Sequence, residues 1–129
     1  MSKHPADLPD AARRHQHCAD MLHDAEPAEA GYLYGLAAEC AVKQVATMVP
    51  CLRRDDILYA HFPDLRRLVL DHAAGREAQR LLRLISDPSG YLGGWHVSMR
   101  YANRRAVNVD LTEAWRRHAT SALSLMEST

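Results

Sequence analysis

The chain has 129 residues, of which 47% are hydrophobic and 25% charged, and its 16 basic and 16 acidic residues give a formal net charge of zero. This length suits one domain with a buried core, and the charge balance gives no global positive field of the kind that marks many nucleic-acid-binding domains. No apolar run reaches membrane-spanning length, and the stretch "MSKHPADLPD" lacks the apolar centre of a signal peptide. We therefore expect a single domain over residues 1–129 in a cytoplasmic protein that does not bind a membrane.

Helical periodicity dominates the first half of the chain. Apolar or small residues recur at helical spacing from Leu8 onward, which predicts an amphipathic first helix. Pro27 suits the first turn of a second helix, which we expect to run to about Met48 and to stop before Pro50. Because the second helix is apolar over most of its circumference, we expect it to lie at the centre of a bundle.

The second half predicts shorter helices. One turn is expected around 54–59, a third helix after Asp64 that Gly75 interrupts or ends, and a fourth over "REAQRLLRLIS", which "DPSG" at 87–90 terminates. Asp110 and Glu113 have the spacing of a capping box, with Asp110 at the N-cap of the last helix. No segment shows convincing β-alternation. The pattern predicts an all-α, up-and-down bundle of four to five helices.

The segment "WHVSMRYANRR", residues 95–105, concentrates arginine and aromatic residues after a glycine pair. Arginine forks suit phosphate, and aromatic rings can stack on bases. We therefore predict a ligand-binding set formed by Trp95, Arg100, Tyr101, Arg104, Arg105 and Lys43. The structural alternative is that the aromatic side chains close one end of the core while the arginines form surface ion pairs.

Glu39 stands in the middle of the apolar second helix, where an unpaired carboxylate would cost several kcal/mol, roughly, or take up a proton. Lys43 follows four residues later, and Tyr32 and Gly35 share the same strip of the helix. We expect Glu39 either to pair with Arg100 or to belong to a polar seam that faces water.

The histidines do not predict a metal site. His15 and His118 lie on the apolar faces of their helices, a position typical of hydrogen-bonded packing groups. His15 and His17 would be about 200° apart on a helix and cannot share an ion. The sequence also lacks the motifs of a nucleophile elbow, a phosphate-binding loop or a dinucleotide-binding turn. We expect no metal and no cofactor.

The segments "AARRHQHCADML" and "YLYGLAAECAVKQV" (32–45), followed by "HFPDLRRLV" and the "RY" segment before the last helix, resemble HEPN domains, which are small prokaryotic helical bundles. The resemblance implies a homodimer. It also implies a nucleotidyltransferase-type antitoxin as partner, or binding of nucleotide or RNA. Active members of that family are metal-independent endoribonucleases in which an arginine precedes a histidine by four to six residues, and a polar residue at the position of Glu39 orients the arginine.

Arg100 occupies the place of that arginine, but no histidine follows it within reach. His96, four residues earlier, is the candidate substitute. Arg67 and His72 match the spacing literally, but their side chains would diverge on the third helix. We therefore expect a non-catalytic or degenerate HEPN-like module that binds nucleotide, RNA or a partner, on the toxin side of a toxin–antitoxin pair. The alternatives are an endoribonuclease that uses Arg100, His96 and Glu39, and a purely structural protein.

Overall fold

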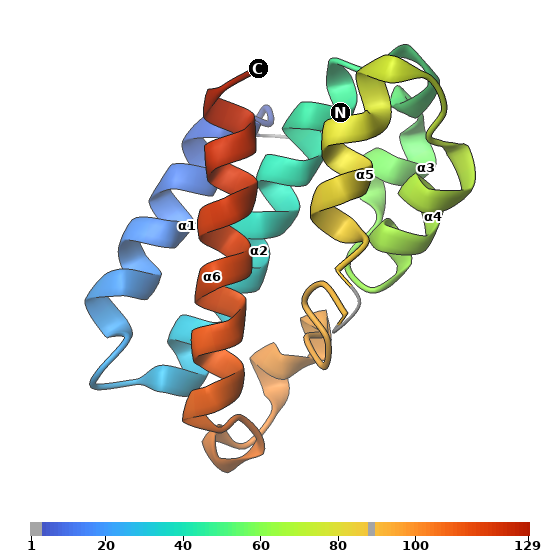
Figure 1. The fold of residues 1–129 in the computed structure, drawn as a ribbon. Helices are drawn as coiled ribbons and strands as arrows, with labels where there is room; N and C mark the ends of the chain where they lie inside the picture. Colours follow the sequence, from blue (N-terminus) through green and yellow to red (C-terminus); the bar gives the residue numbers. More distant parts are fainter. Residues whose placement is uncertain (1–3, 88–89) are drawn as a thin grey trace.

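A computed structural model describes residues 4–87 and 90–129, and within these ranges the secondary structure is helical, with no strand. The helices are α1 (Leu8–Leu22), α2 (Pro27–Thr47), α3 (Asp55–Tyr59), α4 (Asp64–His72), α5 (Gln79–Ile85) and α6 (Val109–Glu127), with short 3₁₀ helices η1 (Pro50–Leu52), η2 (Arg76–Ala78), η3 (Val97–Tyr101) and η4 (Arg104–Ala106). In Figure 1, the long helices α1, α2 and α6 run alongside one another, and the short helices α3, α4 and α5 lie to one side of them.

Helix α2 is central, as its apolar circumference predicts. It packs against both α1 and α6, and its alanines Ala30, Ala37, Ala38 and Ala41 are completely buried. Two glycines make room for the two tryptophans of the chain. A Cβ at Gly31 would lie 2.9 Å from the Trp115 ring, and a Cβ at Gly35 would lie 1.9 Å from Nε1 of Trp95. The small residues of α2 therefore admit both indoles to the core.

The predicted helix positions are confirmed for α1 and α2, and the all-α class is confirmed for the described residues. The described residues contain six α-helices, against the four to five predicted, because the single turn expected around 54–59 forms a helix of its own, α3. The break predicted at Gly75 is present, and the φ of that residue is +84°. The predicted terminator "DPSG" includes residues 88–89, which lie outside the described residues, and α5 ends before it at Ile85.

The predicted cap of the last helix is wrong by two residues. Asn108, not Asp110, is the N-cap of α6, and its side-chain oxygen accepts a hydrogen bond from the Leu111 amide at 2.8 Å. Asparagine caps a helix as well as aspartate does, and Asp110 then lies in the first turn, where a carboxylate interacts favourably with the helix dipole.

The chain between α5 and η3 is fastened to α6. His118 accepts a hydrogen bond from the Leu92 amide at 3.0 Å and stacks on Tyr91, with ring centroids 4.7 Å apart. Trp115 Nε1 donates to the Gly93 carbonyl at 3.0 Å. The predicted packing role of His118 is thus confirmed, and these contacts fix the position from which residues 95–105 begin. Of the helices in the described ranges, none is both long and apolar enough to cross a membrane.

Candidate functional site

Trp95 anchors the arginine-rich segment to α2. Its ring stacks on Tyr32 with centroids 5.8 Å apart and an interplanar angle of 10°, and its Nε1 donates to the Tyr32 carbonyl at 3.2 Å. The indole lies against Gly35 and is 2% exposed. Its face is therefore closed to a ligand in this structure, and burial favours the core-closing role that the structural alternative gave it.

Arg100, in η3, lies above the same tyrosine. Its Nε and Nη2 donate to the Tyr32 hydroxyl at 3.0 and 2.8 Å, and its guanidinium carbon is 5.8 Å from the centre of that ring. These hydrogen bonds raise the pKa of the exposed Arg100 guanidinium, so the group stays charged. Among the described residues, no carboxylate approaches Arg100 to within the 4.0 Å of an ion pair. The predicted contact with Glu39 is not formed.

Tyr101, Arg104 and Arg105 continue the surface. The Tyr101 ring is 84% exposed and 5.9 Å from the Arg100 guanidinium carbon. Arg104 lies 3.5 Å from a Glu26 oxygen, with both side chains largely in solvent, and Arg105 forms no ion pair within the described part of the chain. Unlike Trp95, these side chains are available to a ligand. We call Arg100, Tyr101, Arg104 and Arg105 the arginine–tyrosine surface.

A cavity of about 210 Å³ lies beside this surface. Arg100 and Arg104 line it from one side, and Glu26 and Glu29 line it from the start of α2. Because two carboxylates face the two guanidinium groups, the cavity has a mixed charge. A phosphate would therefore be held better on the outer side of the arginines, toward Tyr101, than inside the cavity.

His96 does not converge with Arg100. It is the N-cap of η3, where its Nδ1 accepts a hydrogen bond from the Ser98 amide at 3.0 Å. Because His96 precedes the helix and has an extended backbone (φ −152°, ψ 146°), it shares no helical face with Arg100. The geometry gives the pairing of Arg100 with His96 no support.

Glu39 is buried and its partner is His61, a residue that the sequence did not single out. Both carboxylate oxygens lie 3.0 Å from His61 Nδ1, Oε1 also accepts the Phe62 amide at 3.3 Å, and Oε2 lies 3.6 Å from Lys43 Nζ. The expected partner, Arg100, is instead held by Tyr32, and the expected seam facing water is excluded because Glu39 is 4% exposed.

The carboxylate orients the His61 ring. The contact holds Nδ1 against the carboxylate and leaves Nε2 without a bond to Glu39, in a side chain that is 47% exposed. The burial of Glu39 was the signal that a partner must exist. No spacing identifies His61, because the contact depends on the fold of the connection between α3 and α4, where the buried Phe62 holds the chain against the core.

Lys43 lies apart from the arginine–tyrosine surface. It is 8% exposed and eleven residues beyond Tyr32 on α2, which places it about 16 Å further along the helix axis. In the sequence, Lys43 shares a strip of the second helix with Glu39, which is the residue expected to pair with Arg100. In the structure Arg100 contacts α2 at Tyr32, whereas Lys43 lies beside Glu39 further along the same helix.

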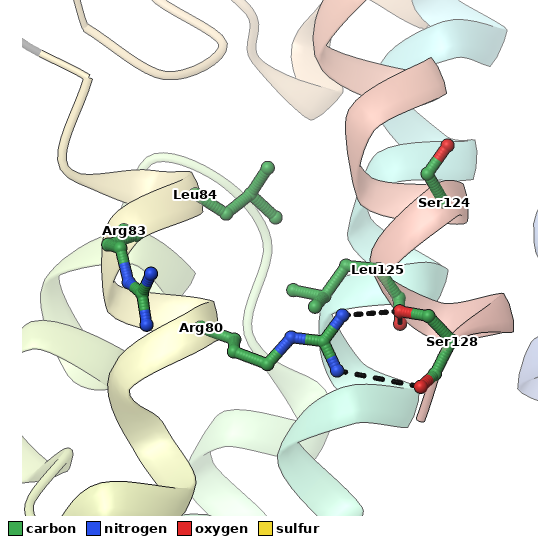
Figure 2. Close-up of a pocket in the computed structure, with 6 residues that line it drawn as sticks. All are labelled: Arg80, Arg83, Leu84, Ser124, Leu125 and Ser128. Atoms are coloured by element: carbon green, nitrogen blue, oxygen red, sulfur yellow. Dashed lines mark hydrogen bonds between the residues drawn. The ribbon is translucent and has the colours of Figure 1, made fainter.

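A third basic region lies between α5 and the end of α6, where a cavity of about 410 Å³ is lined by Arg80, Arg83, Leu84, Ser124, Leu125 and Ser128 (Figure 2). Arg80 donates to the Ser128 hydroxyl at 2.5 Å and to its carbonyl at 3.5 Å. A cation at the C-terminal end of a helix satisfies its last carbonyl groups and opposes its dipole. Arg80 is therefore explained as a cap of α6, and the dipole there disfavours an anionic ligand.

Comparison of the chain with protein-family models, with curated proteins and with solved structures finds no match in any of the three. The resemblance to HEPN domains therefore stays an expectation. Within the described residues, no group of three or more His, Cys, Asp or Glu side chains is arranged to hold a metal ion.

Proposed function

We propose that this protein is a non-catalytic, HEPN-like binding module that holds single-stranded RNA or a nucleotide on the arginine–tyrosine surface. One observation carries the proposal. The Arg100 guanidinium is fixed by the Tyr32 hydroxyl, remains exposed without a carboxylate partner in the described structure, and stands next to a tyrosine ring that is 84% exposed.

Tyr32 prepares Arg100 for an anion. Hydrogen bonds to a neutral hydroxyl restrict the side chain without neutralising it, so less conformational entropy is lost when a ligand binds. Because the two bonds to Tyr32 come from Nε and Nη2, Nη1 is not engaged by that hydroxyl and can donate to phosphate oxygens. A guanidinium that is held in place but keeps its charge is better suited to binding a phosphate than to forming a purely structural ion pair.

Tyr101 supplies the stacking partner. Its ring lies beside the Arg100 guanidinium, which suits a nucleotide whose base stacks on the tyrosine while its phosphate meets the arginine. Arg104 and Arg105 follow within one short segment and extend the positive charge along a strand. Because the net charge of the chain is zero and Glu26 is nearby, we expect moderate affinity that falls steeply with salt.

Binding of a fluorescein-labelled single-stranded RNA, followed by anisotropy at low salt, tests this function. Tyr101→Ala should weaken binding at least about fivefold, since a stacked base contributes about 1–3 kcal/mol, and Arg100→Ala should weaken it by a similar factor. Arg13→Ala is the matched control, because Arg13 is an exposed arginine that pairs with Glu127 elsewhere. Equal losses in all three variants, or no binding by the wild type, would reject the proposal.

The resemblance also leads us to propose that the module is a homodimer and the toxin-side component of a pair with a nucleotidyltransferase-type antitoxin. Sedimentation equilibrium tests the first part, with twice the chain mass expected. A reading frame for a nucleotidyltransferase beside the gene, whose product co-purifies with this chain, tests the second. A monomer at all concentrations, or a neighbour that does not bind, would contradict the respective part.

A second candidate, metal-independent endoribonuclease activity, is favoured by the Glu39–His61 pair. A histidine whose Nδ1 is held by a buried carboxylate can move protons through Nε2. Seven residues separate Tyr32 from Glu39, so Arg100 and His61 attach to the same face of α2 about 10 Å apart along its axis. Cleavage of RNA in EDTA that is lost in His61→Asn and kept in His17→Asn would support this candidate. Intact RNA after prolonged incubation would exclude it and leave the binding proposal standing.

A further inference from the structure

A cavity of about 320 Å³ opens between the C-terminal half of α2 and the segment formed by η1 and α3, away from the arginine–tyrosine surface. Its lining residues come from these elements and the connection between them: Lys43, Ala46, Thr47, Leu52, Arg53, Arg54, Asp55, Ile57 and Leu58. Its size falls within the range of small-molecule sites, about 300–1,000 Å³.

Lys43 supplies a buried positive charge to this cavity. Its side chain is 9% exposed, and its nearest carboxylate oxygen, on Glu39, lies at 3.6 Å, which is longer than a hydrogen bond. Glu39 is already engaged by His61 and the Phe62 amide. In the described structure the Lys43 ammonium donates no hydrogen bond, although it has three donors. Because no fully buried side-chain nitrogen of the described residues lacks a hydrogen-bond partner, this ammonium reaches the open space of the cavity, where its unused donors can meet an anion in addition to Glu39.

The remaining walls are mainly apolar. Ala46, Leu52 and Ile57 are at most 2% exposed, and Leu58, at 37%, stands at the opening. The polar groups at the rim are largely engaged with other parts of the chain. Arg53 Nε donates to the Thr47 carbonyl at 2.8 Å, and the Arg54 guanidinium donates to the Asp56 carboxylate at 3.0 Å through both Nε and Nη2.

We propose that this cavity binds a small amphipathic carboxylate, with its head group on Lys43 and its apolar chain against Leu52, Ile57 and Leu58. The lining contains three cationic side chains and one carboxylate, Asp55, so its charge complements an anion. A single buried ammonium suits a singly charged head group, and the apolar walls exclude a polynucleotide. This site is independent of the RNA-binding function proposed above.

Calorimetric titration with octanoate, octanol and octylammonium tests the proposal. Octanoate should bind at least about tenfold more tightly than octanol, and octylammonium should not bind. Lys43→Met keeps the aliphatic stem and removes the charge, and it should reduce octanoate affinity to that of octanol. Arg100→Ala should leave octanoate binding unchanged, which separates this site from the RNA surface.

Lys43→Met also removes the contact with Glu39 and can alter the fold, so a second variant tests the site without changing that contact. Leu58→Glu places a negative charge at the opening and should weaken octanoate binding at least about tenfold. Leu70→Glu is its matched control, because Leu70 is also 37% exposed but lies on α4 outside the cavity lining. Octanol binding as tightly as octanoate, or octanoate affinity unchanged in both Lys43→Met and Leu58→Glu, would overturn the proposal.

Discussion

The hydroxyl of Tyr32 accepts two hydrogen bonds from the guanidinium of Arg100, at 3.0 Å from Nε and 2.8 Å from Nη2. Tyr32 belongs to the central helix, and its ring also stacks on the buried Trp95. Tyr32 therefore positions both Trp95, which anchors the segment 95–105 to the core, and Arg100, the cation in the middle of that segment. This connection between packing and an uncompensated surface charge is the basis of the proposed function.

Tyr32→Phe should separate these two roles. The substitution keeps the ring that stacks on Trp95 and removes the hydroxyl that holds Arg100, which becomes free to move. We expect RNA affinity to fall about threefold to tenfold while the melting temperature changes little, because Arg100 is exposed. Anisotropy and thermal unfolding measure the two effects, with Tyr59→Phe on α3 as the exposed control. An unchanged RNA affinity would mean that the hydroxyl does not prepare Arg100.

Glu39→Ala should destabilise the fold strongly. Removing the carboxylate leaves the Lys43 ammonium and the Phe62 amide buried without their partner, and breaking a buried pair in this way costs about 3–5 kcal/mol. His61→Ala should cost much less, since that side chain is 47% exposed. Urea unfolding of the two variants gives the comparison. Similar stabilities for both would show that Glu39 is not engaged as described.

Gly35→Ala should destabilise the protein, against the usual trend. Alanine in place of glycine normally stabilises a helix by about 1 kcal/mol. Here the added Cβ would lie 1.9 Å from Trp95 Nε1, so the indole must leave its position on Tyr32. We expect a lower free energy of unfolding and increased tryptophan exposure in fluorescence quenching. A stabilised variant with a protected indole would contradict the packing of Trp95.

His118 should make stability depend on pH. Burial lowers the pKa of His118 below its ordinary value of 6.5. The charge of Asp87 opposes this shift, and the charge of Arg117 adds to it by a smaller amount. The unfolded chain therefore takes up the proton more readily, and the stability that the neutral ring contributes is present above about pH 6.5 and is lost as the pH falls.

His118→Asn isolates this contribution, because asparagine can accept the Leu92 hydrogen bond and does not titrate. Between pH 7.5 and 5, the free energy of unfolding of the wild type should fall more than that of the variant. The other titrating groups are common to both chains and cancel in the difference. If the free energy of unfolding fell equally with pH in both proteins, the role assigned to the neutral His118 ring would be contradicted.

The sequence predicted the fold better than the site, for physical reasons. Helical periodicity and the positions of Pro27, Pro50 and Gly75 are local signals, and they placed α1, α2 and the break between α4 and α5. The asparagine cap of α6 was missed because Asp110 offers an equally plausible cap two residues later. Local pattern alone does not decide between two good caps.

The site depended on contacts between distant residues. The position of Glu39 in an apolar helix correctly signalled a buried carboxylate that needs a partner, but nothing in the spacing distinguishes His61 from Arg100 as that partner. Trp95 and Tyr101 are aromatic residues of the same predicted ligand-binding set, yet Trp95 is 2% exposed and Tyr101 is 84% exposed. Gly35 lacks a side chain and leaves the space against α2 that the Trp95 indole fills.

The most direct test of the central claim is a nuclear magnetic resonance titration of the ¹⁵N-labelled protein with a short single-stranded RNA. Our account predicts that the amide signals of residues 96–106 and the side-chain signal of Arg100 Nε shift in proportion to bound RNA, while those of α4 and α5 stay in place. It also predicts that Arg100→Ala reduces these shifts at the same RNA concentration. Shifts centred on another face, or the absence of any shift at low salt, would contradict the assignment of the arginine–tyrosine surface as the binding site.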